Sequence, residues 1–281
     1  MPTIAYLGPE HTNTHLAAVS RFGRRARYLH APTVDDVFHL VERRRAQYGV
    51  VPVENSLEGA VTHTLDRFID FVDTPVTIHG EIEQPIRHCL IFRPASSRAA
   101  IRIVYSHPQA LAQCQRWLTE HLPGLTSVRE TSSTAEAVQH LLRTGQGLWK
   151  LRERAAIARE ELAAQHKLSS MPIPQERENR TRFVILGLGR PKRGRRNKTS
   201  MLVLLKDRPG ALHDMLVPFK KARINMTKIE SRPSKKKVWS YYFFVDFEGH
   251  KEDPRVKQVL KALERKCVFF KVMGSYPKAE A

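Results

Sequence analysis

Short apolar runs alternate with amphipathic stretches along the first part of the chain. Residues 3–7 and 48–52 are apolar, rich in β-branched side chains and bounded by turn residues, which predicts strands. Between them, Thr33 and Asp36 form a helix-capping pattern ahead of an amphipathic stretch that ends near Arg44. A helix at residues 12–20 and a short strand at Tyr28 are also predicted, so the order is β-α-β-α-β, which is typical of an α/β domain with a largely parallel or mixed sheet.

The same alternation continues to residue 186. Further strands are predicted at residues 76–83, 86–92, 101–105 and 182–186. Two helices are predicted to begin at serine caps, Ser106 followed by Gln109 and Ser133 followed by Glu136. The predicted class of this part is therefore α/β.

A basic segment that contains Pro and Gly, residues 190–198, separates a second pattern from the first. After it, strands are predicted at 200–205, 225–230, 238–247 and 268–273, and helices at 211–222 and 254–265. The order βαββαβ is that of a ferredoxin-like sandwich. Domain boundaries fall in exposed segments of this composition, so we expect domains at 1–188 and 198–281.

Composition agrees with two domains, because 281 residues with 41% apolar side chains can bury a sizeable core. The chain contains no apolar run of about 18 residues and starts with neither a basic leader nor a cleavage site, which predicts a cytoplasmic protein without a membrane partner. Cys89, Cys114 and Cys267 are far apart and outside any C-x-x-C spacing. We therefore expect reduced thiols, with no disulfide and no metal site.

A net charge of +19 and a pI near 10.2 raise nucleic acid as a partner. However, the arginines are dispersed, and the densest basic run, 190–198, has no aromatic residue on which a base could stack. We therefore predict a solvated linker and no nucleic-acid partner. A basic surface also suits an enzyme that acts on an anionic substrate, since it steers the encounter.

Three polar segments follow or open predicted strands, where α/β proteins place their ligands: residues 8–12, 53–59 and 179–183. Each one alone also has a structural explanation. Gly8-Pro9 and Gly59 fit turns, Asn55 fits a helix cap, and Thr181 is a β-branched residue entering a strand.

Together these segments resemble the prephenate dehydratase family. The family pattern G-P-x-G-T-F-S/T is matched in part by residues 8–14, V-P-I-E-N-S-L-E-G by 51–59, and N-x-T-R-F by 179–183, and further blocks match at 106–111 and 133–137. The first loop departs from the pattern, because His11 stands where the family has Gly and Asn13 where it has Phe or Tyr. This leaves open whether the loop keeps the family's backbone path.

The resemblance implies two α/β lobes around a cleft, as in a periplasmic binding protein, and conversion of prephenate to phenylpyruvate, water and carbon dioxide. Neither metal nor cofactor is implied, because the ring gains aromaticity as the carboxylate and hydroxide leave. The essential threonine of the family's T-R-F is Thr181 here. A Thr hydroxyl is a weak acid, so we interpret it as a positioned hydrogen-bond donor to the leaving oxygen.

Other residues follow from the same motifs. Glu54 would repel a dianion, so Glu54 and Asn179 are expected to orient the site without touching the substrate. Residues expected to bind the substrate and its carboxylates are Thr12, Asn55, Ser56, Ser133, Thr134, Arg182 and Phe183.

The second domain resembles the ACT domains attached to this family. Residues 209–212 match its G-A-L loop, and 225–233 match N-L-T-K-I-E-S-R-P. The resemblance implies phenylalanine sensing at an interface between subunits, in a homodimer or homotetramer; the alternative is a module that only dimerises. The implied phenylalanine-binding residues are Gly210, Ala211, Leu212, Asn225, Glu230, Ser231 and Arg232.

The predicted function is thus a prephenate dehydratase of phenylalanine biosynthesis, inhibited by phenylalanine. Two alternatives remain open at this point: a non-catalytic two-lobed ligand-binding sensor, and an arogenate dehydratase. Arogenate differs from prephenate by an amino group that no motif in the chain identifies.

Overall fold

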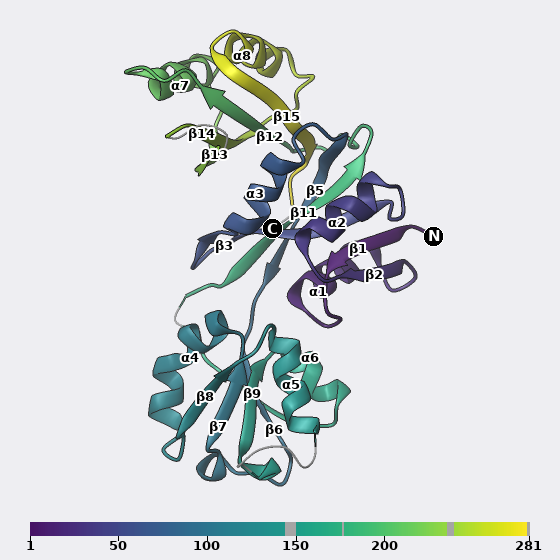
Figure 1. Cartoon of the computed structure of the whole chain (residues 1–281), viewed down its shortest axis with the longest axis vertical. Helices are drawn as coiled ribbons and strands as arrows, with labels where there is room; N and C mark the ends of the chain where they lie inside the picture. Colours follow the sequence, from purple (N-terminus) through teal and green to yellow (C-terminus); the bar gives the residue numbers. More distant parts are fainter. Residues whose placement is uncertain (144–149, 176, 235–238, 280–281) are drawn as a thin grey trace. The chain divides into compact units, whose positions relative to one another are not determined.

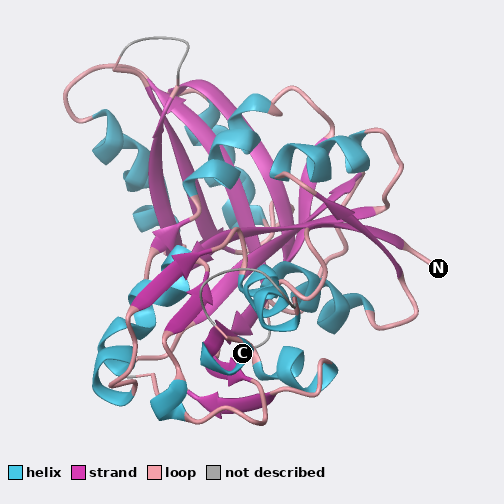
Figure 2. Ribbon diagram, turned by 60° about the horizontal axis from the view of Figure 1, so that its bottom comes forward, coloured by secondary structure: helices cyan, strands magenta, loops and turns pink. Residues whose placement is uncertain are grey.

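The computed structural model describes residues 1–143, 150–175, 177–234 and 239–279 (Figure 1). Helices and strands alternate through the chain, which confirms the predicted α/β class (Figure 2). The chain divides into two compact units. The first unit comprises residues 1–7, 17–84 and 181–281, and the second unit comprises residues 8–16 and 85–180.

A mixed sheet forms the centre of the first unit's N-terminal part. Its strand order is β2-β1-β3-β11-β5, with β4 paired to β3. Strand β1 is parallel to β2 and β3, whereas β11 is antiparallel to β3. The strands are β1 (Thr3–Leu7), β2 (Arg27–Ala31), β3 (Tyr48–Asn55), β4 (Gly59–Ala60), β5 (Val76–Pro85) and β11 (Arg180–Leu188). The accompanying helices are α1 (Asn13–Phe22), α2 (Val34–Glu42) and α3 (Thr62–Asp70).

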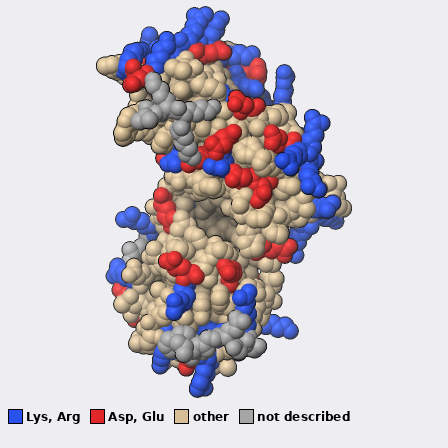
Figure 3. Space-filling view, viewed as in Figure 1, with Lys and Arg blue, Asp and Glu red and all other residues tan. Residues whose placement is uncertain are grey.

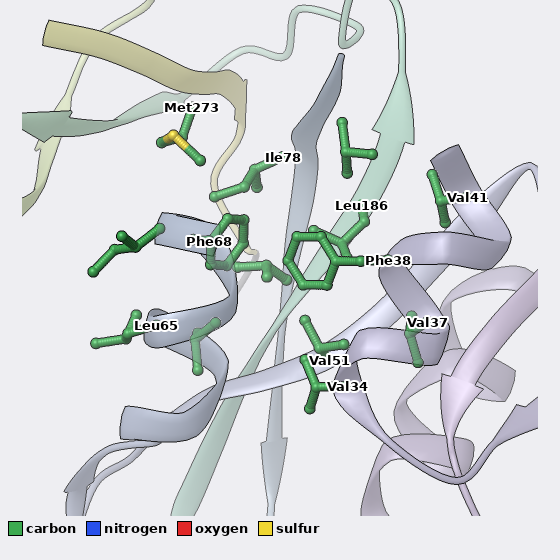
Figure 4. Packing of buried hydrophobic residues seen from close by; sticks show 14 of the residues in the cluster. Val34, Val37, Phe38, Val41, Val51, Leu65, Phe68, Ile78, Leu186 and Met273 are labelled. Carbon is green, nitrogen blue, oxygen red and sulfur yellow. The ribbon is translucent and has the colours of Figure 1, made fainter. Parts of the chain in front are cut away.

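Helix α2 shows how the sequence produces these elements. The Thr33 hydroxyl accepts a hydrogen bond from the Asp36 N–H at 3.2 Å, and the Asp36 carboxylate accepts one from the Thr33 N–H, also at 3.2 Å. The predicted capping box is therefore confirmed. Apolar side chains at i, i+3, i+4 and i+7 face the sheet, and Phe38 meets Phe68 of α3 at a ring distance of 5.1 Å (Figure 4).

The second unit has its own sheet with the order β10-β6-β9-β7-β8. Its central strand β9 is fully buried, because α4 packs on one face of the sheet while α5 and α6 pack on the other. The strands are β6 (Cys89–Phe92), β7 (Ile103–Ser106), β8 (Ser127–Glu130), β9 (Arg154–Ala158) and β10 (Ser169–Pro172). The helices are α4 (Pro108–His121), α5 (Thr134–Leu142) and α6 (Glu160–Gln165), with 3-10 turns at Arg98–Ala100 and Leu151–Glu153.

The C-terminal part of the first unit is an antiparallel sheet with two helices in the predicted βαββαβ order. Its strand order is β13-β14-β12-β15. The elements are β12 (Asn197–Leu205), α7 (Ala211–Ala222), β13 (Met226–Pro233), β14 (Tyr241–Glu248), α8 (Pro254–Glu264) and β15 (Cys267–Pro277). The bounds of α7 agree with the prediction; the predicted strand 238–247 starts at Val238, which lies outside the described residues.

Both faces of this C-terminal sheet are covered. One face packs on α7 and α8 through Phe219, Val256 and their neighbours. On the other face, Met273 and Phe244 join a core with Phe68 and Ile78 of the N-terminal part (Figure 4). The two parts of the first unit therefore share one continuous hydrophobic core.

Some local predictions were wrong. Ser106 does not cap α4, because its buried hydroxyl donates to the Ile157 carbonyl at 2.7 Å. The cap is His107, whose Nδ1 accepts the Gln109 N–H at 3.3 Å, and Pro108 takes the first helical position, where no N–H is needed. Helix α3, strand β8 and strand β9 were not predicted at all.

The basic segment 190–198 also differs at its end from a solvated linker. Lys198 lies in β12 with its side chain 4% exposed, and its ammonium contacts the Glu81 carboxylate at 2.7 Å. Elsewhere positive charge is spread over the surface, including the exposed faces of α7 and α8 (Figure 3). Within the described ranges, none of the helices is long and apolar enough to cross a membrane.

Candidate functional site

Two residues from different predicted motifs meet where β3 ends and β11 begins. Asn55 is the last residue of β3, and the antiparallel register places it opposite Thr181. The Asn55 side-chain N–H donates a hydrogen bond to the Thr181 hydroxyl oxygen at 3.0 Å. Both side chains are half-buried. The structure thus brings together the predicted catalytic residue and one predicted substrate-binding residue.

The orientation of the Asn55 amide is fixed by the turn that follows β3. Its side-chain oxygen accepts the N–H groups of Leu57 at 3.0 Å and Glu58 at 3.2 Å. With the oxygen occupied in this way, only the amide N–H can face Thr181. Because the Thr181 oxygen accepts that bond, its own proton is available to donate to another acceptor.

Glu54 and Arg182 lie next to these two residues but interact with each other. They pair in the β3–β11 register, and the guanidinium contacts the Glu54 carboxylate at 2.5 Å. Arg182 also contacts Asp246 at 2.9 Å and Glu81 at 3.5 Å, and its side chain is 12% exposed. Burial by itself lowers the pKa of Arg182, but Asp246, Glu54 and Glu81 outweigh it and raise that pKa, so the side chain keeps its charge.

This placement argues against the predicted role of Arg182 in substrate binding. Successive side chains of a strand point to opposite faces, so Arg182 points away from the face that carries Thr181. Sequence reasoning missed its partners Glu81 and Asp246. A signal was present for Asp246, because it stands between Val245 and Phe247 in a largely apolar strand.

Phe183 and Ser56 also have clear positions. Phe183 is 1% exposed and packs with Ile4, Tyr6 and Ile185 in the core. A ring enclosed in this way has no surface to offer a ligand, which argues against its predicted contact with the substrate. Ser56 is exposed in the turn after Asn55.

In the second unit, the predicted binding hydroxyls stand at helix starts. The Thr12 hydroxyl donates to the Pro9 carbonyl at 3.0 Å and accepts the His15 N–H at 3.3 Å, just before α1. Ser133 is the cap of α5, accepting the Glu136 N–H at 3.0 Å. Thr134 is the first residue of the same helix. Helix starts of this kind favour anions.

Asn179 belongs to a buried polar chain in the second unit. It is 3% exposed, and its side-chain N–H donates to the Gln113 oxygen at 2.9 Å. The same oxygen lies 2.9 Å from Nε2 of His88. Since an amide oxygen only accepts, His88 carries its proton on Nε2. The site-orienting role of Asn179 stays a prediction.

The first loop explains one departure from the family pattern. His11 has a φ of +64°, in the left-handed region that favours glycine, so this position adopts a conformation that suits the glycine of the family pattern. The conformation is supported by bonds from the His11 N–H to His15 Nδ1 at 3.0 Å and between the His11 ring and Gln165 at 3.1 Å. Burial and His11 lower the pKa of His15.

No group of three potential metal ligands occurs within the part of the chain that is described.

A cavity of about 330 Å³ lies at the start of α7 in the C-terminal part. Gly210, Ala211 and Leu212 line it, together with Trp239 and Tyr241. Gly210 has a φ of +74°, which an L side chain rarely adopts, and it lines the cavity directly before α7 begins.

The other predicted phenylalanine-binding residues do not line this cavity within one chain. Asn225 and Ser231 are exposed, and Glu230 is half-buried on β13. Arg232 binds Asp66 of α3 with two hydrogen bonds, of 2.9 and 3.1 Å. In this structure, Arg232 therefore joins the C-terminal sheet to the N-terminal part.

Comparisons with known proteins agree with this arrangement. Residues 4–190 match the family model "Prephenate dehydratase", and residues 199–265 match the model "ACT domain". The chain is 47% identical to a bifunctional chorismate mutase/prephenate dehydratase of Aquifex aeolicus, over 98% of this chain and 74% of that protein. It is 38% identical to a prephenate dehydratase of Methanocaldococcus jannaschii, over 87% and 86%.

A solved structure is also similar. A prephenate dehydratase of Arthrobacter aurescens in complex with L-Phe has a TM-score of 0.87 and 32% identity, covering 98% of this chain and 89% of that one. Family models that cover most of the chain, together with a similar fold, establish the family to which the chain belongs. The chain belongs to the prephenate dehydratase family and carries a C-terminal ACT domain.

Proposed function

We propose that the protein converts prephenate to phenylpyruvate, water and carbon dioxide, and that Thr181 is the catalytic residue. The observation that carries the proposal is the Asn55–Thr181 hydrogen bond at 3.0 Å. Asn55 donates to the hydroxyl oxygen, so the Thr181 proton is directed to a second acceptor. In the proposed reaction, that acceptor is the departing hydroxyl oxygen of the substrate.

The driving force lies in the substrate. The bond to the ring carboxylate breaks and its electron pair enters the ring; the carbon–oxygen bond on the opposite side breaks, and the hydroxide leaves as water after taking a proton. Thr181 stabilises the charge that develops on the leaving oxygen. Hydrogen-bond assistance of this kind typically accelerates a reaction about 10²- to 10⁴-fold.

We propose that Thr12, Ser133 and Thr134 bind substrate carboxylates; Asn55 and Ser56 are proposed as further substrate-binding residues. The support is the position of the first three at helix starts, where backbone N–H groups and the helix dipole favour negative charge. Arg182 is left out of this set because Glu54, Glu81 and Asp246 occupy its guanidinium. We assign no step to a metal or cofactor.

An assay with purified protein tests the activity directly. Phenylpyruvate formation from prephenate is followed by absorbance, and phenylalanine formation from arogenate is measured alongside at the same substrate concentrations. The proposal predicts turnover of prephenate well above that of arogenate. Turnover of arogenate alone would make the protein an arogenate dehydratase, and binding of prephenate without any turnover would favour the non-catalytic sensor.

We also propose that phenylalanine inhibits the enzyme by binding at the cavity lined by Gly210, Ala211 and Leu212. A cavity of about 330 Å³ is at the small end of ligand sites and suits one amino acid. The carboxylate would meet the start of α7, and the aromatic ring would meet Leu212 and Tyr241. Asn225, Glu230 and Ser231 would complete the site from a second subunit of a homodimer or homotetramer.

Two exposed aliphatic residues of the ACT domain provide a matched test of this site. Leu212 is 40% exposed and lines the cavity, whereas Val268 is 62% exposed and does not line it. Leu212→Ala should weaken phenylalanine binding in calorimetry by about 10-fold, since burying a leucine is worth roughly 1.5–3 kcal/mol. Val268→Ala should bind as the wild type does. Equal affinity of both variants would place phenylalanine elsewhere.

The remaining proposals concern the setting of the enzyme. We propose a catalytic domain at 1–188, a regulatory domain at 198–281, a cytoplasmic location and no nucleic-acid partner. The three unpaired cysteines support a reducing compartment.

A further inference from the structure

Charged side chains from both domains form a buried cluster beside the site. The catalytic domain contributes Arg182, Glu54 and Glu81, and the ACT sheet contributes Lys198, Lys228 and Asp246. We call these six residues the interdomain charge cluster. Arg182 contacts all three carboxylates, Lys198 contacts Glu81 at 2.7 Å, and Lys228 contacts Glu54 at 3.4 Å.

The cluster is balanced and mostly removed from water. Three cations face three carboxylates, and the exposed fractions of the side chains are 0% for Glu81, 4% for Lys198 and 7% for Lys228, whereas Glu54 at the edge of the cluster is 36% exposed. Burial lowers the pKa of Lys228, and Glu54 opposes this. A charge in such surroundings depends on its partners, so removing one member shifts the positions of the others.

The cluster is one peptide bond away from both partners of the Asn55–Thr181 hydrogen bond. Arg182 directly follows Thr181, and Glu54 directly precedes Asn55. The Arg182–Glu54 pair therefore runs parallel to the Asn55–Thr181 pair across the same two strands. Any shift between Arg182 and Glu54 also changes the distance between Thr181 and Asn55.

Hydrogen bonds within the ACT sheet hold the Asp246 carboxylate in place. The Ser200 hydroxyl donates to Asp246 at 2.6 Å, and Tyr276 meets Ser200 at 2.7 Å. The second oxygen of Asp246 is left for Arg182, at 2.9 Å. The position of the Arg182 guanidinium is thus set by the regulatory domain as well as by the catalytic one.

We propose that Asp246 and Lys228 of the ACT domain are positioning residues for the dehydration reaction, because they hold Arg182 and Glu54 and thereby set the Asn55–Thr181 hydrogen bond. This inference rests on the proposed function. It implies that two side chains of the ACT sheet contribute to the geometry of the catalytic site.

A different result is expected if the cluster only holds the two domains together. The Arg232–Asp66 pair also joins the two domains, yet neither residue neighbours Thr181 or Asn55 in the register. Asp66→Asn therefore weakens docking without disturbing the site. On the same strand as Asp246, Glu248 pairs with Lys278 and is 39% exposed, so Glu248→Gln provides a second control with the same loss of charge.

The test compares Asp246→Asn with these two controls. An asparagine can still accept the Ser200 hydrogen bond, but its NH₂ group then faces Arg182 and cannot accept, so the variant keeps the size of the side chain and loses both the charge and the hydrogen bond to Arg182. We expect kcat to fall about 10- to 100-fold, the range that follows from small misplacement of a catalytic group, with little change in KM. Both controls should turn over prephenate at the wild-type rate. Equal kcat values for Asp246→Asn and Glu248→Gln would overturn the proposal.

A double-mutant cycle separates positioning from general damage. If Asp246 acts through Thr181, then Asp246→Asn has no further effect on kcat in the Thr181→Ala background. If the two effects multiply, Asp246 acts by another route and the proposal is wrong.

Folding and the proposed function are tested separately. Lys228→Met is the second variant, since methionine fits an apolar setting and Arg182 still pairs with Glu54; we expect a smaller fall in kcat of about threefold to tenfold. If both variants fail to fold, the cluster is needed for folding and the proposal is overturned.

Hydrogen exchange of residues 177–184 tests the proposal without an activity assay. Exchange should be faster in Asp246→Asn than in Glu248→Gln, and equal exchange counts against the proposal even if the wild type lacks prephenate turnover. Wild-type inactivity alone rejects only the proposed function.

Discussion

Asn55→Asp reverses the direction of one hydrogen bond and leaves the rest of the site in place. Asn55 accepts two backbone N–H groups on one atom and donates to Thr181 with the other. A carboxylate still accepts from Leu57 and Glu58, but at 3.0 Å from the Thr181 oxygen it can only accept. The Thr181 proton then turns towards the carboxylate and is lost to the leaving group.

The magnitude follows from that loss. The variant should fall towards the activity of an enzyme without the Thr181 hydroxyl, about 10²- to 10⁴-fold below the wild type in kcat. The two backbone N–H bonds keep the pKa of the introduced carboxyl below the usual value of about 3.9, so it is ionised at neutral pH. Folding stability should be nearly unchanged, because the turn keeps both of its hydrogen bonds.

The added charge also repels an anionic substrate, and this effect must be separated from the first. Leu57→Asp is the matched control, since Leu57 is 41% exposed in the same turn and does not touch Thr181. Phenylpyruvate formation is measured for both variants over a range of prephenate concentrations. The control should change KM more than kcat. If kcat of Asn55→Asp stays within about threefold of the control, the proton of Thr181 has no role in the reaction.

Two further predictions concern stability and reactivity. Phe183→Ala should lower the free energy of unfolding by about 3–5 kcal/mol in urea titrations, because the ring is enclosed by the core. A loss of stability near zero would favour the predicted contact of Phe183 with the substrate. Burial raises the pKa of Cys114 to about 12, so this thiol should resist alkylation at pH 8 in the native protein and react in urea, as mass spectrometry can show; rapid native labelling of Cys114 would contradict its burial.

The domain types and the candidate pair Asn55 and Thr181 can be predicted from the sequence, because motifs and strand ends are recognised from short stretches of residues. Asn55 and Thr181 each belong to a motif that predicts a site residue. The contact itself depends on the antiparallel β3–β11 register between segments 126 positions apart, which no local pattern encodes.

The two arginines show what local patterns could not provide. Arg182 and Arg232 stand in motifs that suggest ligand binding, yet each pairs with carboxylates from distant segments. Whether an arginine contacts a ligand or a neighbouring domain depends on packing between those segments.

Helix α3 was not predicted for a simpler reason. No side chain caps its start, although its buried residues are spaced as in an amphipathic helix.

The most direct test of the central claim is the rate constant for prephenate conversion by Thr181→Ala. The proposed mechanism predicts a fall in kcat of about 10²- to 10⁴-fold, equivalent to roughly 3–5 kcal/mol of barrier, with a much smaller change in KM. Thr181→Ser keeps the hydroxyl and should retain much more activity than the alanine variant. An alanine variant that turns over prephenate at a near-normal rate would remove Thr181 from the mechanism.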